Sequence, residues 1–127
     1  MFGSDIIRIK VKGYLRNITD NEIFEFEERG IKNKDKITFN NNDIKYSIKC
    51  NDNEIMMIRD GNDFVNTFIF NNNNSKSNYL LKDNNYDIDI DVELNNMNIC
   101  DNYLDIAYKI IDTDNLYEFR IEMSDMI

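Results

Sequence analysis

The sequence predicts an all-β fold, an antiparallel up-and-down β-barrel of about eight to ten strands. Apolar and polar residues alternate with period two along the chain, and no stretch keeps an apolar stripe of helical spacing over several turns. Short polar breaks rich in Asn, Asp and Gly separate the alternating runs, as tight turns do. With 127 residues the chain can bury one sizeable core, so we expect a single domain over residues 1–127.

The first half of the chain contains five expected strands. Residues 6–16 alternate aliphatic with basic side chains, residues 22–29 alternate phenylalanine with glutamate, and the break NITDN separates the two. Residues 36–39 (KITF) and 43–49 (DIKYSIK) flank the break NNN. Residues 54–59 (EIMMIR) form an apolar run that ends at the turn sequence DGND. Each run is short enough for one strand, and each break contains residues that tolerate turn conformations.

The second half contains five more. Residues 66–70 (NTFIF) and 77–81 (SNYLL) flank an asparagine-rich hairpin loop. Residues 86–94 (YDIDIDVEL) alternate without an error, and residues 104–112 and 116–123 flank the break DTDN. Closing such a meander removes the exposed edges of its sheet, so we expect a closed or nearly closed barrel whose strands run from about residue 6 to residue 123.

The first two expected strands carry opposite charges on their polar faces. Pairing them through the turn would bring opposite charges together, with each pair contributing about 0.2–1 kcal/mol. The alternative is a cationic docking patch for an anionic partner, although the glutamates would neutralise it. The residues concerned are Arg8, Lys10, Lys12 and Arg16 on the first strand and Glu25 and Glu27 on the second.

The overall charge argues against two classes of partner. The chain has 24 acidic and 15 basic residues and a net charge of −9, which opposes binding to nucleic acid or to an anionic membrane. Residues 1–15 include Asp5, Arg8, Lys10 and Lys12, so they resemble neither a secretory signal nor a membrane span. We therefore expect a cytoplasmic protein, in which Cys50 and Cys100 remain buried, reduced thiols.

The composition also argues against an enzyme and against a metal centre. The sequence has no histidine, which is the commonest general base, and two cysteines cannot complete a four-ligand zinc site. It contains no P-loop, no GxGxxG and no Ser/His/Asp set. We expect no catalytic residues, no metal and no cofactor.

The stretch YDIDIDVEL places an acidic row on one face of its strand. Carboxylates two residues apart on a strand stand about 6.5–7 Å apart, so one strand can supply only one or two of the oxygens that Ca²⁺ needs. We expect a solvated outer face here unless a neighbouring strand adds carboxylates. The row consists of Asp87, Asp89, Asp91 and Glu93.

The apolar faces predict an interior rich in aromatic rings, which favours a filled core or a small pocket. Buried tyrosines need partners for their hydroxyls, either at the rim of the barrel, on the backbone or on a ligand. The expected inward-facing rings are Phe24, Phe26, Tyr46, Phe68, Phe70, Tyr79, Tyr86, Tyr108, Tyr117 and Phe119.

Arg59 interrupts the apolar pattern because strict alternation places it on the face of Ile55 and Met57. An inward guanidinium requires a carboxylate or a bound anion. Glu28 shares a face with Phe24 and Phe26, so the sequence leaves three alternatives open: a Glu28–Arg59 pair, an anion held by Arg59, or an Arg59 that lies in water at the mouth of the barrel.

The order of these elements resembles the YwiB-like family, small bacterial calycin-type β-barrels that form a domain of unknown function. The resemblance rests on EIMMIRDG, TFIF, YDIDIDVELNNMNI, LDIAYKI and YEFRIEM, and its most specific points are the Arg59-x-Gly61 turn, Phe70, Tyr79 and Tyr108. Asn85 stands where the family usually has glycine, and it also tolerates a left-handed backbone angle. The resemblance implies an up-and-down barrel related to lipocalins, and it implies no reaction.

Two functions follow from this interpretation. The first is a binding module that takes a small amphipathic or anionic ligand at the barrel mouth through Arg59, Tyr46, Tyr79 and Tyr108, with Glu28 nearby. The second is a filled barrel that acts as a protein-interaction or regulatory module without a small-molecule ligand. Either would be a monomer or a homodimer.

Overall fold

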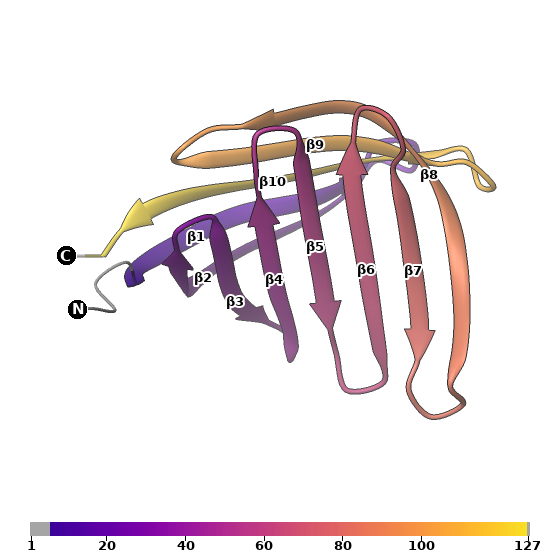
Figure 1. Ribbon diagram of the computed structural model, residues 1–127, viewed down its shortest axis with the longest axis horizontal. Helices are drawn as coiled ribbons and strands as arrows, with labels where there is room; N and C mark the ends of the chain where they lie inside the picture. Colours follow the sequence, from indigo (N-terminus) through magenta and orange to yellow (C-terminus); the bar gives the residue numbers. More distant parts are fainter. Residues whose placement is uncertain (1–5, 127) are drawn as a thin grey trace.

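The computed structural model describes residues 6–126, which form ten antiparallel strands in a closed barrel (Figure 1). Each strand pairs with its neighbours in sequence, and β1 pairs with β10. None of the described residues forms a helix long and apolar enough to cross a lipid bilayer. The strands are β1 (Ile6–Asn17), β2 (Glu22–Asn33), β3 (Lys36–Asn41), β4 (Ile44–Cys50), β5 (Glu54–Asp60), β6 (Phe64–Asn71), β7 (Lys76–Leu81), β8 (Tyr86–Ile99), β9 (Tyr103–Ile110) and β10 (Asn115–Asp125).

All ten expected strands are present, and the differences lie at their ends. β2 continues to Asn33, and β8 continues to Ile99 through a bulge between Leu94 and Asn96. The bulge explains why alternation ends at Leu94, since the extra residue shifts the inward positions by one. Asn85 adopts φ 52°, which confirms that it supplies the left-handed turn angle before β8.

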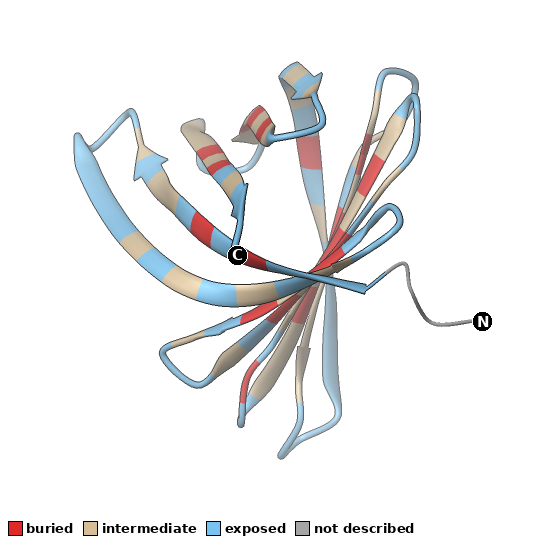
Figure 2. Cartoon of the chain, turned by 90° about the vertical axis from the view of Figure 1, so that its left-hand side faces the viewer, coloured by how far each residue is buried: buried red, intermediate tan, exposed pale blue. Residues whose placement is uncertain are grey.

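The core fills the barrel between two crossing walls. β4–β7 run across the direction of β1, β9 and β10, and buried residues lie within the strands while the turns are exposed (Figures 1 and 2). The inward-facing Gly13 lets β1 lie close to the backbone of β10 and to the Phe26 ring of β2. A Cβ at this position would lie 2.3 Å from the Arg120 carbonyl oxygen and 3.0 Å from the Phe26 ring. Fully enclosed side chains include Val11, Ile48, Ile55, Phe70, Ile106 and Ile121.

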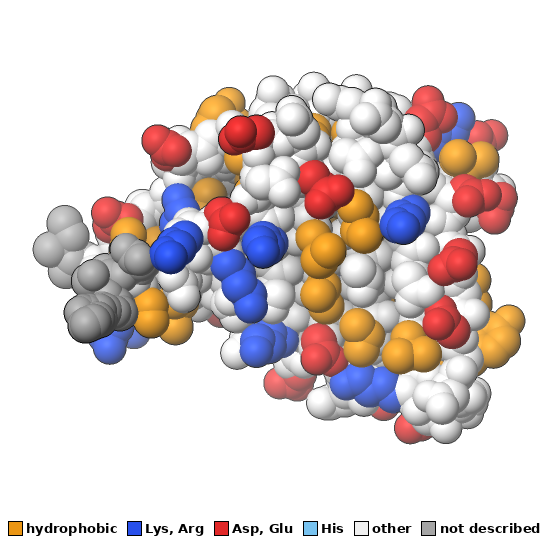
Figure 3. Space-filling model, viewed as in Figure 1, with side chains coloured by type: hydrophobic (Ala, Val, Ile, Leu, Met, Phe, Trp, Pro, Cys, Tyr) orange, Lys and Arg blue, Asp and Glu red, His pale blue; other side chains and the backbone are white. Residues whose placement is uncertain are grey.

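The outer faces of the strands carry the charges. In Figure 3 acidic and basic side chains surround a band of apolar ones on the wall formed by β4–β7. The acidic row on β8 is exposed, as expected, and the amide nitrogen of Asn78 donates to both Asp87 and Asp89. The facing positions on β7 are Lys76, Asn78 and Leu80, so β7 adds no carboxylate. No group of metal-binding side chains forms within residues 6–126.

The first hairpin has only part of the expected charge pairing. Lys10 Nζ lies 3.3 Å from Glu27 Oε2, an exposed diagonal pair. Arg16 instead pairs with Glu118 on β10 at 3.1 Å, because β1 lies between β2 and β10. Glu25 lies opposite Tyr14 rather than opposite a cation. The register therefore divides the basic residues of β1 between two neighbouring strands.

The hairpin turns define two ends of the barrel. The turns β1–β2, β3–β4, β5–β6, β7–β8 and β9–β10 lie at one end, which we call the mouth. Three inward-facing apolar side chains near the mouth remain exposed: Phe24 by 71%, Tyr86 by 55% and Ile88 by 40%. Their exposure shows that the apolar core does not extend to this end.

Candidate functional site

A row of facing residues crosses the inner wall near the mouth. On β4, β5, β6 and β7, the residues directly opposite one another are Tyr46, Arg59, Asn66 and Tyr79. Facing residues in antiparallel strands lie on the same side of the sheet. Arg59 therefore points into the barrel, as the alternation of EIMMIR predicted, and three of the expected ligand-binding residues share one row.

The guanidinium of Arg59 is partly buried and makes two hydrogen bonds. Its Nε donates to the Tyr46 hydroxyl at 3.3 Å, and its Nη1 donates to the Asn66 side-chain oxygen at 3.4 Å. Both distances are long for a charged donor, whose hydrogen bonds to oxygen usually measure about 2.7–2.9 Å. The protein therefore orients this cation without saturating it.

Two aromatic rings lie near the guanidinium of Arg59. Its carbon lies 5.6 Å from the centre of the Tyr46 ring and 6.0 Å from that of Phe64, within or at the limit of a cation–π contact. Tyr79 stacks on Phe64 with centroids 5.4 Å apart and planes 4° apart. Gly61 gives the Phe64 ring its room, because a Cβ there would lie 2.7 Å from that ring.

Asn66 is one of two buried polar residues in the described chain, and its hydrogen bonds fix which atom faces Arg59. Its amide nitrogen donates to the Ser77 hydroxyl at 3.2 Å and to the Asn78 carbonyl at 3.0 Å. Both amide hydrogens are thereby used, and the carbonyl oxygen is left for the arginine. Asn66 acts as a positioning residue for Arg59.

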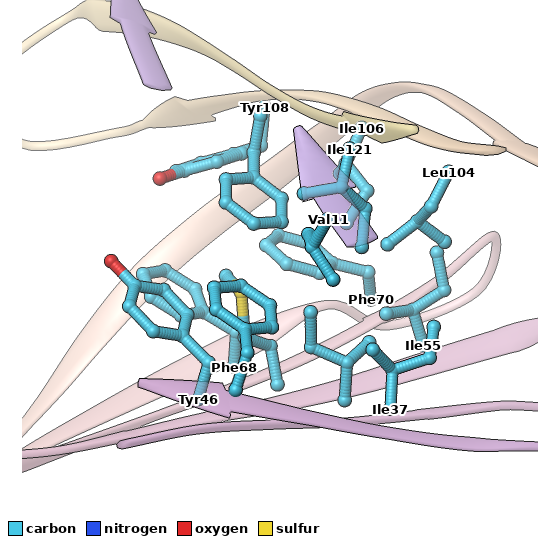
Figure 4. Packing of buried hydrophobic residues seen from close by; sticks show 14 of the residues in the cluster. Val11, Ile37, Tyr46, Ile55, Phe68, Phe70, Leu104, Ile106, Tyr108 and Ile121 are labelled. Carbon is cyan, nitrogen blue, oxygen red and sulfur yellow. The ribbon is translucent and has the colours of Figure 1, made fainter. Parts of the chain in front are cut away.

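Tyr108 approaches the same region from β9. In Figure 4 the hydroxyls of Tyr46 and Tyr108 lie on the same side of the cluster, away from Ile55 and Leu104. Burial raises the pKa of Tyr108 above its ordinary value, and the positive charge of Arg59 opposes that rise. Tyr108 thus remains a neutral phenol at physiological pH.

The Tyr108 hydroxyl has no hydrogen-bond partner among residues 6–126, although its ring is buried. Asp105 Oδ1 is a second oxygen on β9 without a partner among the described residues, and it is enclosed. Asp105 lies on the outer face of β9, opposite Arg120. The Tyr108 hydroxyl, which has no such partner, therefore keeps a proton that it can donate to a ligand.

Glu28 lies apart from this cluster. It faces Val11 across the β1–β2 pair and lines a cavity between β2 and β3 that also includes Phe39. No ion pair joins Arg59 to Glu28 or to another carboxylate within residues 6–126. Of the three alternatives for Arg59, the pair with Glu28 is absent from this part of the chain.

The sequence reasoning missed Phe64, Asn66 and Ser77 as parts of the site. The sequence predicts a strand that begins at Asn66, whereas β6 begins at Phe64. The sequence does contain a signal for these residues, because Asn66 and Ser77 are polar residues on strand faces that are otherwise apolar. A buried polar side chain requires a hydrogen-bond partner, and here the partners are one another and Arg59.

Comparisons with known proteins give one structural match. No protein-family model matches the chain, and no curated protein matches its sequence. The crystal structure of the YwiB protein from Bacillus subtilis matches with a TM-score of 0.69, covering 97% of this chain and 93% of that one at 15% sequence identity. An identity this low shows a shared fold and nothing about function. The chain therefore has a YwiB-like fold, as the resemblance in its sequence predicted.

Proposed function

We propose that this protein binds a small amphipathic anion at the mouth of its barrel. The observation that carries the proposal is a partly buried guanidinium that faces inward and has no carboxylate partner among residues 6–126. A cation removed from water needs a counter-charge, and a ligand carboxylate or phosphate would supply it. Arg59 is therefore the anchor of the proposed site.

The phenols around Arg59 suit an anion as well. The Tyr46 oxygen accepts the Nε–H of Arg59, so its own proton remains available to donate. The Tyr108 hydroxyl is a second such donor, kept neutral by its raised pKa. An acid group placed between them would accept bonds from a cation and from two phenols, all of which complement negative charge.

The apolar part of the ligand has its own surface. Phe24, Tyr86 and Ile88 face inward near the mouth and remain exposed. Covering them would contribute about 25 cal/mol for each Å² of apolar surface removed from water. A ligand with an acid group at one end and a short apolar chain or ring would satisfy both regions.

Binding, rather than catalysis, is the function that these groups support. The cluster consists of a guanidinium, an amide, a serine hydroxyl and phenols, and none of these is a general base at neutral pH. The raised pKa of Tyr108 moves it further from that role. The site can hold and orient a ligand with groups that do not themselves react.

Titration with decanoate, a simple amphipathic carboxylate, tests the proposal by calorimetry. Arg59→Met should weaken decanoate binding by about 10- to 150-fold, the equivalent of about 1.5–3 kcal/mol for hydrogen bonds to a charged group. Arg8→Met is the matched control, because Arg8 is exposed and lies at the end of β1 that is far from the mouth. Equal loss in both variants, or none in Arg59→Met, would remove Arg59 from the site.

A further inference from the structure

β2 has one paired edge and one edge that is free over most of its length. β1 pairs with β2 along residues 22–33, whereas β3 pairs only with residues 30–33. Beyond that short seam β2 runs away from β3 (Figure 1). Along residues 22–29 the backbone N–H and C=O groups of alternate residues bond to β1, and those that point away from β1 lie beyond the ladder with β3. An edge of this kind can accept an added strand.

The free edge is accessible and has space beside it. Ile23 is 53% exposed and Phe24 is 71% exposed, although both are large apolar residues. At the fork where β2 leaves β3 lies a cavity of about 690 Å³, whose lining includes Glu28 from one strand and Phe39 and Asn40 from the other. An extended backbone that entered at this fork would run along β2 towards the mouth.

The charge of the edge selects its partner. Residues 22–29 contain four glutamates and one arginine, a net charge of −3. Two copies paired through this edge would place like charges opposite one another, which is destabilising. A strand that alternates basic with apolar residues would instead meet opposite charges, and the net charge of −9 would attract it from a distance.

β2 already binds such a strand on its other edge. β1 alternates basic with apolar residues in IIRIKVKGYLR, residues 6–16, and Lys10 forms an ion pair with Glu27 at 3.3 Å. We propose that the free edge of β2, residues 22–29, is a docking site for an extended basic and apolar segment of a partner protein. The segment adds a strand next to β2. This site uses none of the Arg59 cluster, and Phe24 is the one residue of the edge that also belongs to the apolar surface of the proposed ligand site.

A synthetic peptide of sequence IIRIKVKGYLR is the direct probe. It should bind at one peptide per chain and slow hydrogen exchange of those amides of residues 22–29 that point away from β1, while the amides of β1 keep their protection. The same peptide with its backbone N-methylated at alternate residues should bind about tenfold or more weakly, because ladder hydrogen bonds are lost. Deprotection of β1 would mean strand exchange and would overturn the proposal.

Charge variants complete the test. Glu25 is exposed and lies on the proposed docking strand, so Glu25→Lys should weaken peptide binding by about two- to fivefold, as expected for one cross-strand charge pair. Asp83→Lys makes the same charge change in the β7–β8 turn and should leave binding unchanged. Equal effects of the two variants, undiminished binding of the N-methylated peptide, or a dimer of the free chain paired through residues 22–29 would each refute the inference.

Discussion

Replacing Arg59 by methionine should separate stability from binding. The side chain makes two long hydrogen bonds and two cation–π contacts at 5.6 and 6.0 Å. At about 0.5 kcal/mol for each, such contacts contribute about 2 kcal/mol. This stabilisation is opposed by the desolvation cost of partly burying a guanidinium that no carboxylate neutralises. We expect that cost to be similar in size to the stabilisation. Methionine removes both terms and keeps an apolar stem against the rings.

We therefore expect the free energy of unfolding of Arg59→Met to stay within about 1 kcal/mol of the wild-type value, while decanoate affinity falls by about tenfold or more. Equilibrium denaturation in urea, followed by circular dichroism, measures the first quantity, and calorimetry measures the second. A loss of more than about 3 kcal/mol in stability would refute the reasoning, because it would make Arg59 a structural residue whose charge the protein already satisfies.

Three further predictions concern the site and the core. Asn66→Asp should supply Arg59 with an internal carboxylate and so weaken decanoate binding by about tenfold or more in calorimetry. In urea denaturation, Ile106→Val should cost about 0.5–1.5 kcal/mol because its side chain is fully buried. Ile31→Val, at a 47% exposed position, should cost less than about 0.5 kcal/mol. Burial raises the pKa of Cys50 to about 11, so the folded state retains a proton that the unfolded state loses above pH 9. Stability should therefore fall between pH 9 and 11, and Cys50→Ser should reduce that fall, unless the thiol ionises freely in the folded state.

The sequence was sufficient to predict the ten strands because each strand has one solvated face and one face towards the core. Apolar and polar residues therefore alternate along it. Strict alternation also placed Arg59 on the face of Ile55 and Met57, but it left open whether the side chain is paired, holds an anion or lies in water at the mouth. The continuation of β8 beyond Leu94 could not be predicted in the same way, since the bulge breaks the alternation. The free edge of β2 was equally hidden, because it depends on where β2 and β3 diverge in space.

The composition of the site depended on register between strands. Tyr46, Arg59 and Asn66 face one another only because β4, β5 and β6 pair as they do, and pairing is a long-range property. The Glu28–Arg59 pair, one of the three alternatives, is absent for the same reason, since β2 carries Glu28 to the fork with β3. The alternation within a strand predicts which face of the sheet each side chain lies on. It does not predict which residues of the adjacent strands lie opposite.

Native mass spectrometry tests the central claim most directly. Wild-type protein, Arg59→Met and Arg8→Met would be purified gently from cell lysate and compared before and after denaturation. We predict an additional mass on the native wild-type and Arg8→Met proteins that is absent from Arg59→Met. Identical native masses for wild-type protein and Arg59→Met would contradict the claim that Arg59 anchors a small ligand at the mouth of this barrel.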